Sequence, residues 1–249
     1  MNLDIGNLVK NFKSTGAKDH PYFWINGASN LIDNLNQMIN FTDYNPVIHT
    51  MAYFENSRSN EIKKLFKKNG SDKFIHDYYI YYSNILANVN NIDLLEIGLG
   101  TKNPELPSTM YFYKQDANFD SIPCSCLRTF KEFLNDESNI YGADIDKEIL
   151  INEDRIYTQF VDQLNKQTIN DLFPDKTFDV IIIDGLHHIT ADVNSIICLV
   201  HRMKDGGQII IEDIAIFDNW KVVDFILSQK FETFFIKDVI GQYMYIIKK

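Results

Sequence analysis

The stretch DLLEIGLG, from Asp93 to Gly100, is the starting point for assigning the fold. An apolar run leads directly into two glycines, which is the pattern of a buried strand that ends in a tight turn. Short runs of the same kind follow at Asn139 to Ile145, Arg155 to Val161, Phe178 to Asp184 and Gly207 to Asp213. None of them alternates strictly between apolar and polar residues, as expected for parallel strands that helices cover on both faces.

The segments between these runs are long enough for crossover helices, which predicts a doubly wound α/β sheet. Two further strands, FETFFIKDV (residues 231–239) and QYMYIIKK (residues 242–249), follow a helix around Trp220 to Ser228. We therefore predict a Rossmann-like sheet of seven strands whose last strand is antiparallel. This arrangement resembles that of class I methyltransferases.

The pattern before residue 91 is helical instead. Ile32, Leu35 and Ile39 recur at helix spacing, and EIKKLFKK (Glu61 to Lys68) and the aromatic stretch from Phe74 to Leu86 both fit amphipathic helices. We predict a helical N-terminal extension at residues 1–90 and the α/β domain at residues 91–249.

Composition limits the classes of partner. The 249 residues include 34 acidic and 24 basic side chains, a net charge of −10, with no basic run, which disfavours a nucleic-acid partner. No apolar stretch approaches the ~18 residues that span a bilayer, and the first residues lack the apolar segment of a secretory signal. Three cysteines suit a reducing compartment. These features predict a cytoplasmic protein with no membrane partner.

Two acidic motifs follow consecutive predicted strands. IIIDGLHH (Ile181 to His188) supplies Asp184, and IIIEDI (Ile209 to Ile214) supplies Glu212 and Asp213. If the two strands are neighbours, their ends lie roughly 5 Å apart, and three carboxylates that close together require a cation or protons. Oxygen ligands favour Mg²⁺, with Mn²⁺ or Ca²⁺ as alternatives. The other interpretation is that these side chains cap the helices that follow.

His187 lies three residues beyond Asp184 and is the candidate general base. A hydroxyl group is a poor nucleophile until it loses its proton, and a metal with a nearby imidazole promotes that loss. For His20, His49, His76 and His201 we expect structural roles.

The other strand ends predict a cofactor site. Gly98 and Gly100 lack the third glycine of a dinucleotide fingerprint, which argues against a nicotinamide cofactor. Asp144 ends the second strand, where a carboxylate can accept both hydroxyls of a ribose, whereas Asp146 also fits a helix N-cap. The third strand runs into Asp162 and Gln163, where an adenine ring would lie.

Taken together, these motifs resemble the metal-dependent sugar O-methyltransferases of macrolide and glycan biosynthesis, with cephalosporin hydroxylase-like proteins as kin. The resemblance covers roughly residues 70 to 215. It rests on GSDKFIHDYY, LLEIGLG, CLRTFKEFL, IYGADID, VDQLN, IIIDGLHH and GGQIIIEDI, which occur in the family order.

The resemblance implies transfer of a methyl group from S-adenosylmethionine to a hydroxyl of a small polar acceptor, a sugar or nucleotide sugar, with Mg²⁺ (or Mn²⁺) and His187 as the base. It implies Asp184, Glu212 and Asp213 as metal ligands. The resemblance also implies that the donor is surrounded by Glu96, Gly98, Asp144, Asp162 and Gln163. Asp72 would contact the donor from a segment that folds over it and that includes Gly70 and His76.

Alternatives stay open at this point. The acceptor could be a phosphorylated or catechol-like metabolite, or the chain could be a donor-binding protein without activity; a nicotinamide oxidoreductase is disfavoured. The sequence does not assign roles to residues 1–69, to the long loop at residues 101–125 or to Arg128, and a homo-oligomer is neither predicted nor excluded.

Overall fold

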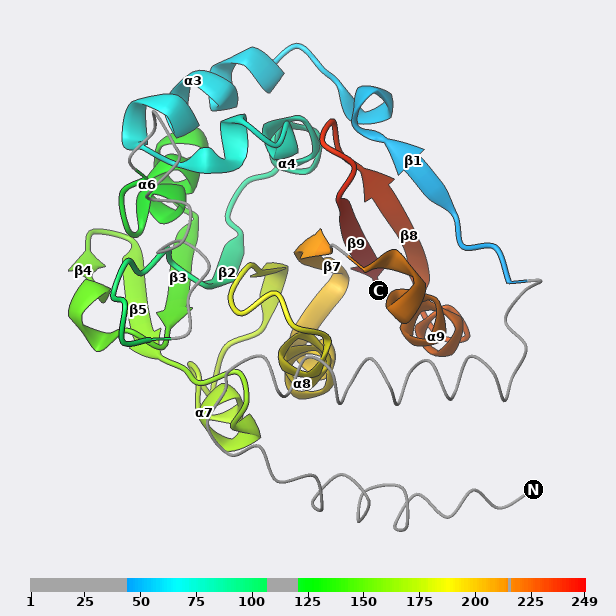
Figure 1. The fold of residues 1–249 in the computed structure, drawn as a ribbon. Coiled ribbons are helices and arrows are strands. Elements are labelled where there is room, and N and C mark those ends of the chain that lie inside the picture. The colour runs from blue at the N-terminus through cyan, green and yellow to red at the C-terminus, as the bar shows by residue number, and fades with distance from the viewer. Residues whose placement is uncertain (1–43, 107–120, 215) are drawn as a thin grey trace. The chain divides into compact units, whose positions relative to one another are not determined.

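One mixed β-sheet organises the part of the chain that the structure describes. The structure is a computed structural model, and it describes residues 44–106, 121–214 and 216–249 (Figure 1). The helix predicted around Ile32, Leu35 and Ile39 lies outside these ranges. The strands are β1 (Ile48–Thr50), β2 (Asp93–Ile97), β3 (Asn139–Asp144), β4 (Asn152–Glu153), β5 (Ile156–Phe160), β6 (Phe178–Ile183), β7 (Met203–Ile214), β8 (Glu232–Lys237) and β9 (Tyr243–Lys248).

The strand order in the sheet is β1-β8-β9-β7-β6-β2-β3-β5-β4. Strands β2, β3, β5, β6 and β7 pair in parallel, and β9 lies antiparallel between β7 and β8. The predicted Rossmann-like sheet with an antiparallel last strand is confirmed. The predicted count of seven strands is wrong, because β1 and β4 add two edge strands of 3 and 2 residues, too short to give a recognisable pattern.

Helices cover both faces of the sheet (Figure 1). One apolar cluster joins the sheet to residues of α3, α4 and α6, and the other joins it to residues of α7, α8 and α9. The helices predicted at residues 61–68, 74–86 and 220–228 are confirmed with shifted ends. The helix bounds are α3 (Ser59–Asn69), α4 (Tyr78–Leu86), α6 (Ser125–Phe133), α7 (Lys166–Asn170), α8 (Ile189–Leu199) and α9 (Phe217–Leu227), with 3-10 turns η2 (Met51–Phe54), η3 (Asp72–Phe74), η4 (Lys147–Ile149) and η5 (Val200–Arg202).

The two-sided cover explains why the central strands are apolar throughout. In β6, Ile181 and Ile183 belong to the cluster on the α8 side, whereas Ile182 belongs to the cluster on the α4 side. All three side chains are at most 1% exposed. Because successive side chains of a strand point to opposite faces, a sheet covered on both faces needs apolar residues at every position.

Residues before position 91 also enter the sheet, because β1 pairs in parallel with β8. The predicted domain boundary at residue 91 stays a prediction. The middle of the predicted long loop, residues 107–120, lies outside the described ranges. None of the helices within the described ranges is long and apolar enough to cross a membrane.

Candidate functional site

Three carboxylates from neighbouring strands face the same side of the sheet. Strands β6 and β7 pair so that Ile183 lies beside Ile211, which brings the next residues, Asp184 and Glu212, together at the carboxyl ends. Glu96 lies on β2, which is the other neighbour of β6. Because alternate residues share a face, all three carboxylates point toward α4 and the connection before it.

A bulge in β7 turns the next carboxylate, that of Asp213, toward the same place. Opposite β9 the pairing passes from Ile211–Tyr245 to Ile214–Tyr243, so β7 carries one extra residue there. Asp213 has a φ of 56°, in the left-handed region that non-glycine residues rarely adopt. A regular strand would send the side chains of consecutive residues to opposite faces, and a bulge re-aims one of them.

Lys73 lies at the centre of the carboxylate cluster. Its side chain is 1% exposed, and its Nζ atom lies 2.6 Å from Asp184 Oδ2, 2.6 Å from Glu212 Oε2 and 3.3 Å from Glu96 Oε1. It comes from η3, the turn that Ser71 caps between α3 and α4. Burial alone lowers the pKa of a lysine, but here the carboxylates outweigh it and raise the pKa of Lys73 well above its ordinary value. The charged form of Lys73 is therefore favoured at this site.

Two tyrosines of α4 complete the contacts. Tyr78 donates a hydrogen bond of 2.5 Å to Asp213 Oδ1, and Tyr82 donates one to Glu212 Oε1. Burial, together with the carboxylates they contact, raises the pKa of both tyrosines well above its ordinary value. Both phenols therefore stay protonated and act as hydrogen-bond donors.

The cluster carries more negative than positive charge, because three carboxylates surround one ammonium group. Glu96 is fully buried and meets Lys73 only at ion-pair distance. Burial raises the pKa of Glu96 to about 7, with Lys73 opposing the shift and Asp184 adding to it. Burial also raises the pKa of Glu212, with Lys73 opposing the shift. Either a further cation or protons on the buried carboxyl groups can therefore balance the cluster.

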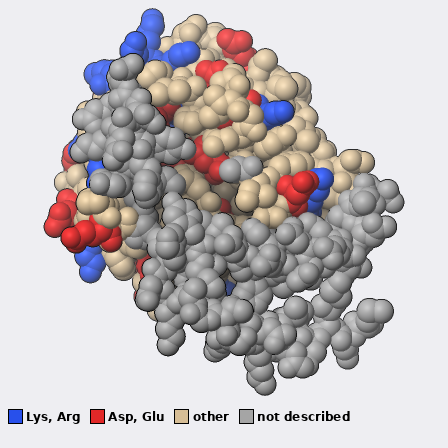
Figure 2. All heavy atoms as spheres, viewed as in Figure 1, with Lys and Arg blue, Asp and Glu red and all other residues tan. Residues whose placement is uncertain are grey.

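A candidate cation site lies beside this cluster. Asp184, His187 and Asp213 each offer a ligand atom, and these atoms lie within 4.8 Å of one another. His187 Nε2 lies 3.7 Å from Asp184 Oδ1 and 3.7 Å from Asp213 Oδ2. All three side chains are partly exposed. Figure 2 shows acidic side chains at the surface in the region where Figure 1 draws α4 and the end of β7. The two carboxylates of this set are ligands that suit a hard divalent cation.

Of the predicted metal ligands, Asp184 and Asp213 therefore converge with His187 on an accessible point. Glu212 is adjacent but is 2% exposed, and both of its oxygens are engaged by Lys73 and Tyr82. The predicted ligand role of Glu212 and the base role of His187 stay predictions.

Gly98 and Gly100 occupy different surroundings at the end of β2. Gly98 has a φ of 96°, and a Cβ there would lie 2.0 Å from the carbonyl oxygen of Asp184. Gly100 has a φ of 82°, and no atom of the described residues would lie within 4 Å of its Cβ, apart from its chain neighbours. Gly98 thus permits β2 and β6 to approach each other, while Gly100 borders open space.

The carboxylate of Asp144 holds backbone at the same edge. It is 4% exposed, and it accepts hydrogen bonds from the backbone N–H of Leu99 (2.6 Å) and of Asp146 (2.8 Å). Asp146 is the N-cap of η4, as the alternative interpretation predicted, and it also accepts from Thr101. Asp144 thereby ties the turn after β2 to the end of β3.

The remaining predicted donor residues lie around this edge. Gln163 accepts a hydrogen bond from Leu186 N–H (2.8 Å) and supports the turn that carries His187. Asp162 is partly exposed and accepts from the backbone of Leu164. Asp72 is half-buried at the start of η3. Their roles at a donor stay predictions.

Arg128 makes its contacts away from the cluster, whereas His76 contacts one of the two tyrosines beside it. Arg128 pairs with Glu153 of β4 at 2.7 Å, which links α6 to the edge of the sheet. His76 stacks on the ring of Tyr78 and lies 3.8 Å from Asp238.

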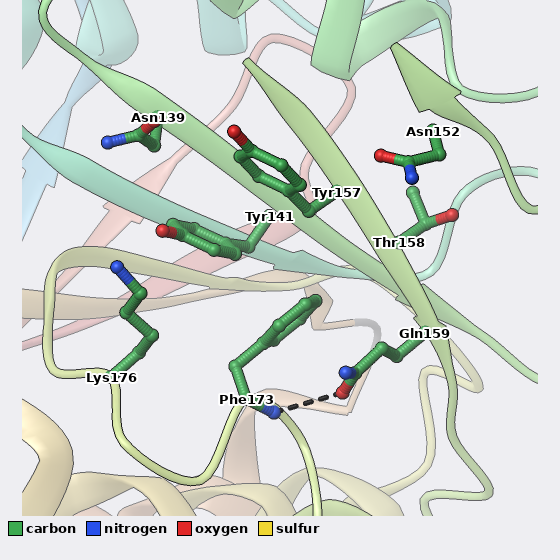
Figure 3. A pocket seen from close by; sticks show the side chains of 8 residues that line it. All are labelled: Asn139, Tyr141, Asn152, Tyr157, Thr158, Gln159, Phe173 and Lys176. Carbon is green, nitrogen blue, oxygen red and sulfur yellow. Dashed lines mark hydrogen bonds between the residues drawn. The ribbon is translucent and has the colours of Figure 1, made fainter. Parts of the chain in front are cut away.

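An open pocket of about 460 Å³ lies elsewhere, on the sheet face near β3 and β5 (Figure 3). The rings of Tyr141 and Tyr157 stack in it with centroids 5.5 Å apart. It shares no residue with the carboxylate cluster. Its lining residues are Asn139, Tyr141, Asn152, Tyr157, Thr158, Gln159, Phe173 and Lys176.

Comparison with solved structures identifies the fold. A structure of MycE methyltransferase from the mycinamycin biosynthetic pathway, in complex with Mg and SAH, matches with a TM-score of 0.57 at 20% identity, over 75% of this chain and 54% of MycE. The chain has the class I methyltransferase fold. A MycE structure in complex with Mg, SAH and mycinamycin VI matches equally, over 78% of this chain and 54% of MycE. This chain therefore spans about half the length of MycE. No protein-family model and no curated protein matches it.

Sequence reasoning missed Lys73, Tyr78 and Tyr82 as site residues. Lys73 and Tyr78 lie in GSDKFIHDYY, one of the stretches that carry the family resemblance, and Tyr82 lies three residues beyond it. The spacing of the two tyrosines, i and i+4, places them on one face of a helix, which was a usable signal. Lys73 offered no comparable pattern.

Proposed function

We propose that this protein transfers a methyl group from S-adenosylmethionine to a hydroxyl of a small polar acceptor, a sugar or nucleotide sugar, with the help of Mg²⁺. The observation that carries the proposal is the convergence of Asp184, His187 and Asp213 at the carboxyl ends of β6 and β7. In open parallel sheets ligands bind at this edge. The fold likeness to MycE, whose structures contain Mg and SAH, supports the same reading.

The donor would lie over the turn after β2. Among the described residues, no atom apart from its chain neighbours would lie within 4 Å of a Cβ at Gly100. The Asp144 carboxylate, which accepts backbone hydrogen bonds at both oxygens, could accept further ones from ribose hydroxyls. S-adenosylmethionine carries its methyl group on a sulfonium, so the protein's task is mainly to align donor and acceptor.

The acceptor hydroxyl would bind at the cation site. Asp184 and Asp213 would hold Mg²⁺, which supplies Lewis-acid assistance by lowering the pKa of an acceptor hydroxyl. His187 would then accept the proton at Nε2, the atom that faces both carboxylates. Tyr78 fixes the second oxygen of Asp213, so that carboxylate cannot turn away.

The test is methyl transfer from labelled S-adenosylmethionine to a panel of sugars, nucleotide sugars, catechols and phosphorylated metabolites. Transfer to a sugar-type acceptor, lost on chelation and restored by Mg²⁺, is the expected result. Labelling that persists in full without a divalent cation would contradict the metal role. Transfer only to catechols or phosphorylated metabolites would contradict the acceptor class.

A further inference from the structure

The site's carboxylates differ in how many of their oxygens the protein already uses. Asp184 gives Oδ2 to Lys73, while its Oδ1 faces His187 at 3.7 Å. Asp213 gives Oδ1 to Tyr78, while its Oδ2 faces His187 at 3.7 Å. Each of these two carboxylates therefore has one anchored oxygen and one oxygen directed at the candidate cation site.

Glu212 is different, because both of its oxygens are held. Oε2 lies 2.6 Å from the ammonium of Lys73, and Oε1 accepts the hydrogen bond of Tyr82. The side chain of Glu212 is 2% exposed and that of Lys73 is 1% exposed, so water does not compete for these contacts. A buried carboxylate with an ammonium and a phenol as partners has no need of another cation.

We propose that Lys73 is a positioning residue that retains Glu212 as its own counter-charge and presents Asp184 to the cation through a single oxygen. The inference rests on the proposed function and deepens it. Because Lys73 and Glu212 pair with each other, Asp184 and Asp213 are the two carboxylates that each direct an oxygen at the cation site. A hexacoordinate Mg²⁺ with few protein ligands keeps positions for water and for the acceptor.

The decisive experiment compares Glu212→Gln with Asp213→Asn in the full-length protein. Each variant removes one negative charge from the same site, but only the second removes an oxygen that faces the cation. Mn²⁺ affinity, measured by calorimetry and by the electron paramagnetic resonance signal of free Mn²⁺, should fall further in Asp213→Asn, by about tenfold or more. An equal or larger loss in Glu212→Gln would make Glu212 a ligand and overturn the assignment.

Lys73 itself supplies the second arm. Lys73→Met removes a positive charge beside the cation and releases two carboxylate oxygens, so Mn²⁺ affinity should rise by about tenfold or more while turnover falls. Lys73→Arg keeps the charge, and its affinity should stay near that of the unaltered protein. If Lys73 had a purely structural role, replacing it would not raise the affinity for Mn²⁺. A fall in Mn²⁺ affinity in both Lys73 variants would count against the proposal.

The comparison of Glu212 with Asp213 leaves Lys73 in place, so it decides the question independently of how well Lys73→Met folds. Calorimetric titration with S-adenosylhomocysteine, expected to be unchanged in all variants, shows that each is folded. Failure of the unaltered protein to bind Mn²⁺ would refute the proposed function itself. Equal losses in the two acidic variants would refute only the role of Lys73.

Discussion

The two glycines at the end of β2 test how tightly β2 packs against β6 beside Asp184. Gly98→Ala places a methyl group 2.0 Å from the carbonyl oxygen of Asp184 and 2.6 Å from Gly185 Cα, both of them backbone atoms. Gly100→Ala places the same group where no atom of the described residues, other than its chain neighbours, lies within 4 Å, with a similar positive φ of 82° against 96°. The two substitutions therefore share the backbone cost and differ in the steric cost.

The magnitudes follow from these distances. A left-handed φ costs an L-residue about 1–2 kcal/mol, which applies to both variants. Overpacking against backbone that must shift costs a further ~1–3 kcal/mol, which applies to Gly98→Ala alone. The free energies of unfolding should differ by that second amount, roughly 2–12 °C in Tm for a chain of this size.

Denaturant unfolding and thermal melts measure the difference directly. Mn²⁺ titration adds a second readout, because Gly98→Ala forces the backbone of Asp184, a proposed ligand, to move. The Mn²⁺ affinity of Gly98→Ala should therefore fall, whereas that of Gly100→Ala should not. Equal stability of the two variants would show that β2 and β6 are not packed as tightly as described, and the placement of Asp184 would be wrong with it.

Further predictions concern single side chains. His187→Ala should lower turnover by roughly 10²- to 10⁴-fold with little change in Mn²⁺ affinity, whereas a matching loss of affinity would make the imidazole a ligand instead of the base. Asp184→Asn should weaken Mn²⁺ binding and abolish turnover but spare donor binding. Its control is Asp205→Asn, near the other end of β7, where the side chain of Asp205 is 97% exposed. This control should change none of these properties. Tyr82→Phe should cost about 2 kcal/mol of unfolding free energy because it leaves a buried carboxylate oxygen without its donor. Tyr81→Phe, which loses a hydrogen bond to a neutral amide, should cost about 1 kcal/mol; equal costs would contradict the charged partner assigned to Tyr82.

Strand ends were predictable because the signal is local. A run such as FDVIII can be buried on both sides only in a covered sheet, and the polar residue that ends it must lie at the edge. The sequence therefore predicts that Asp184 and Glu212 lie close together if their strands are neighbours, and β6 does pair with β7. Strands β1 and β4 were not predicted, because strands of three and two residues are too short to show a pattern of apolar and polar positions.

Lys73 could not be found in this way, since nothing near it in the sequence marks it as buried. Lysines are almost never fully buried unless they are paired, and the partners of Lys73 are 23, 111 and 139 residues away in the chain. The sequence does show that the carboxylates at the sheet edge lack a balancing positive charge. The sequence predicts that a cation or protons balance the carboxylates of Asp184, Glu212 and Asp213. In the structure a side chain of the protein, that of Lys73, balances part of this charge.

Glu212 and Asp213 show where strand periodicity stops being a guide to chemistry. Adjacent residues of a regular strand face opposite sides, so a regular β7 would let only one of the two join Asp184, although the sequence motif predicts both as metal ligands. The bulge in β7 and the positive φ of Asp213 bring both to the same side. Lys73 and Tyr82 then engage one, and the other is left facing His187. If the site works as proposed, the irregular backbone of β7 separates a structural carboxylate from a metal-binding one at two consecutive positions.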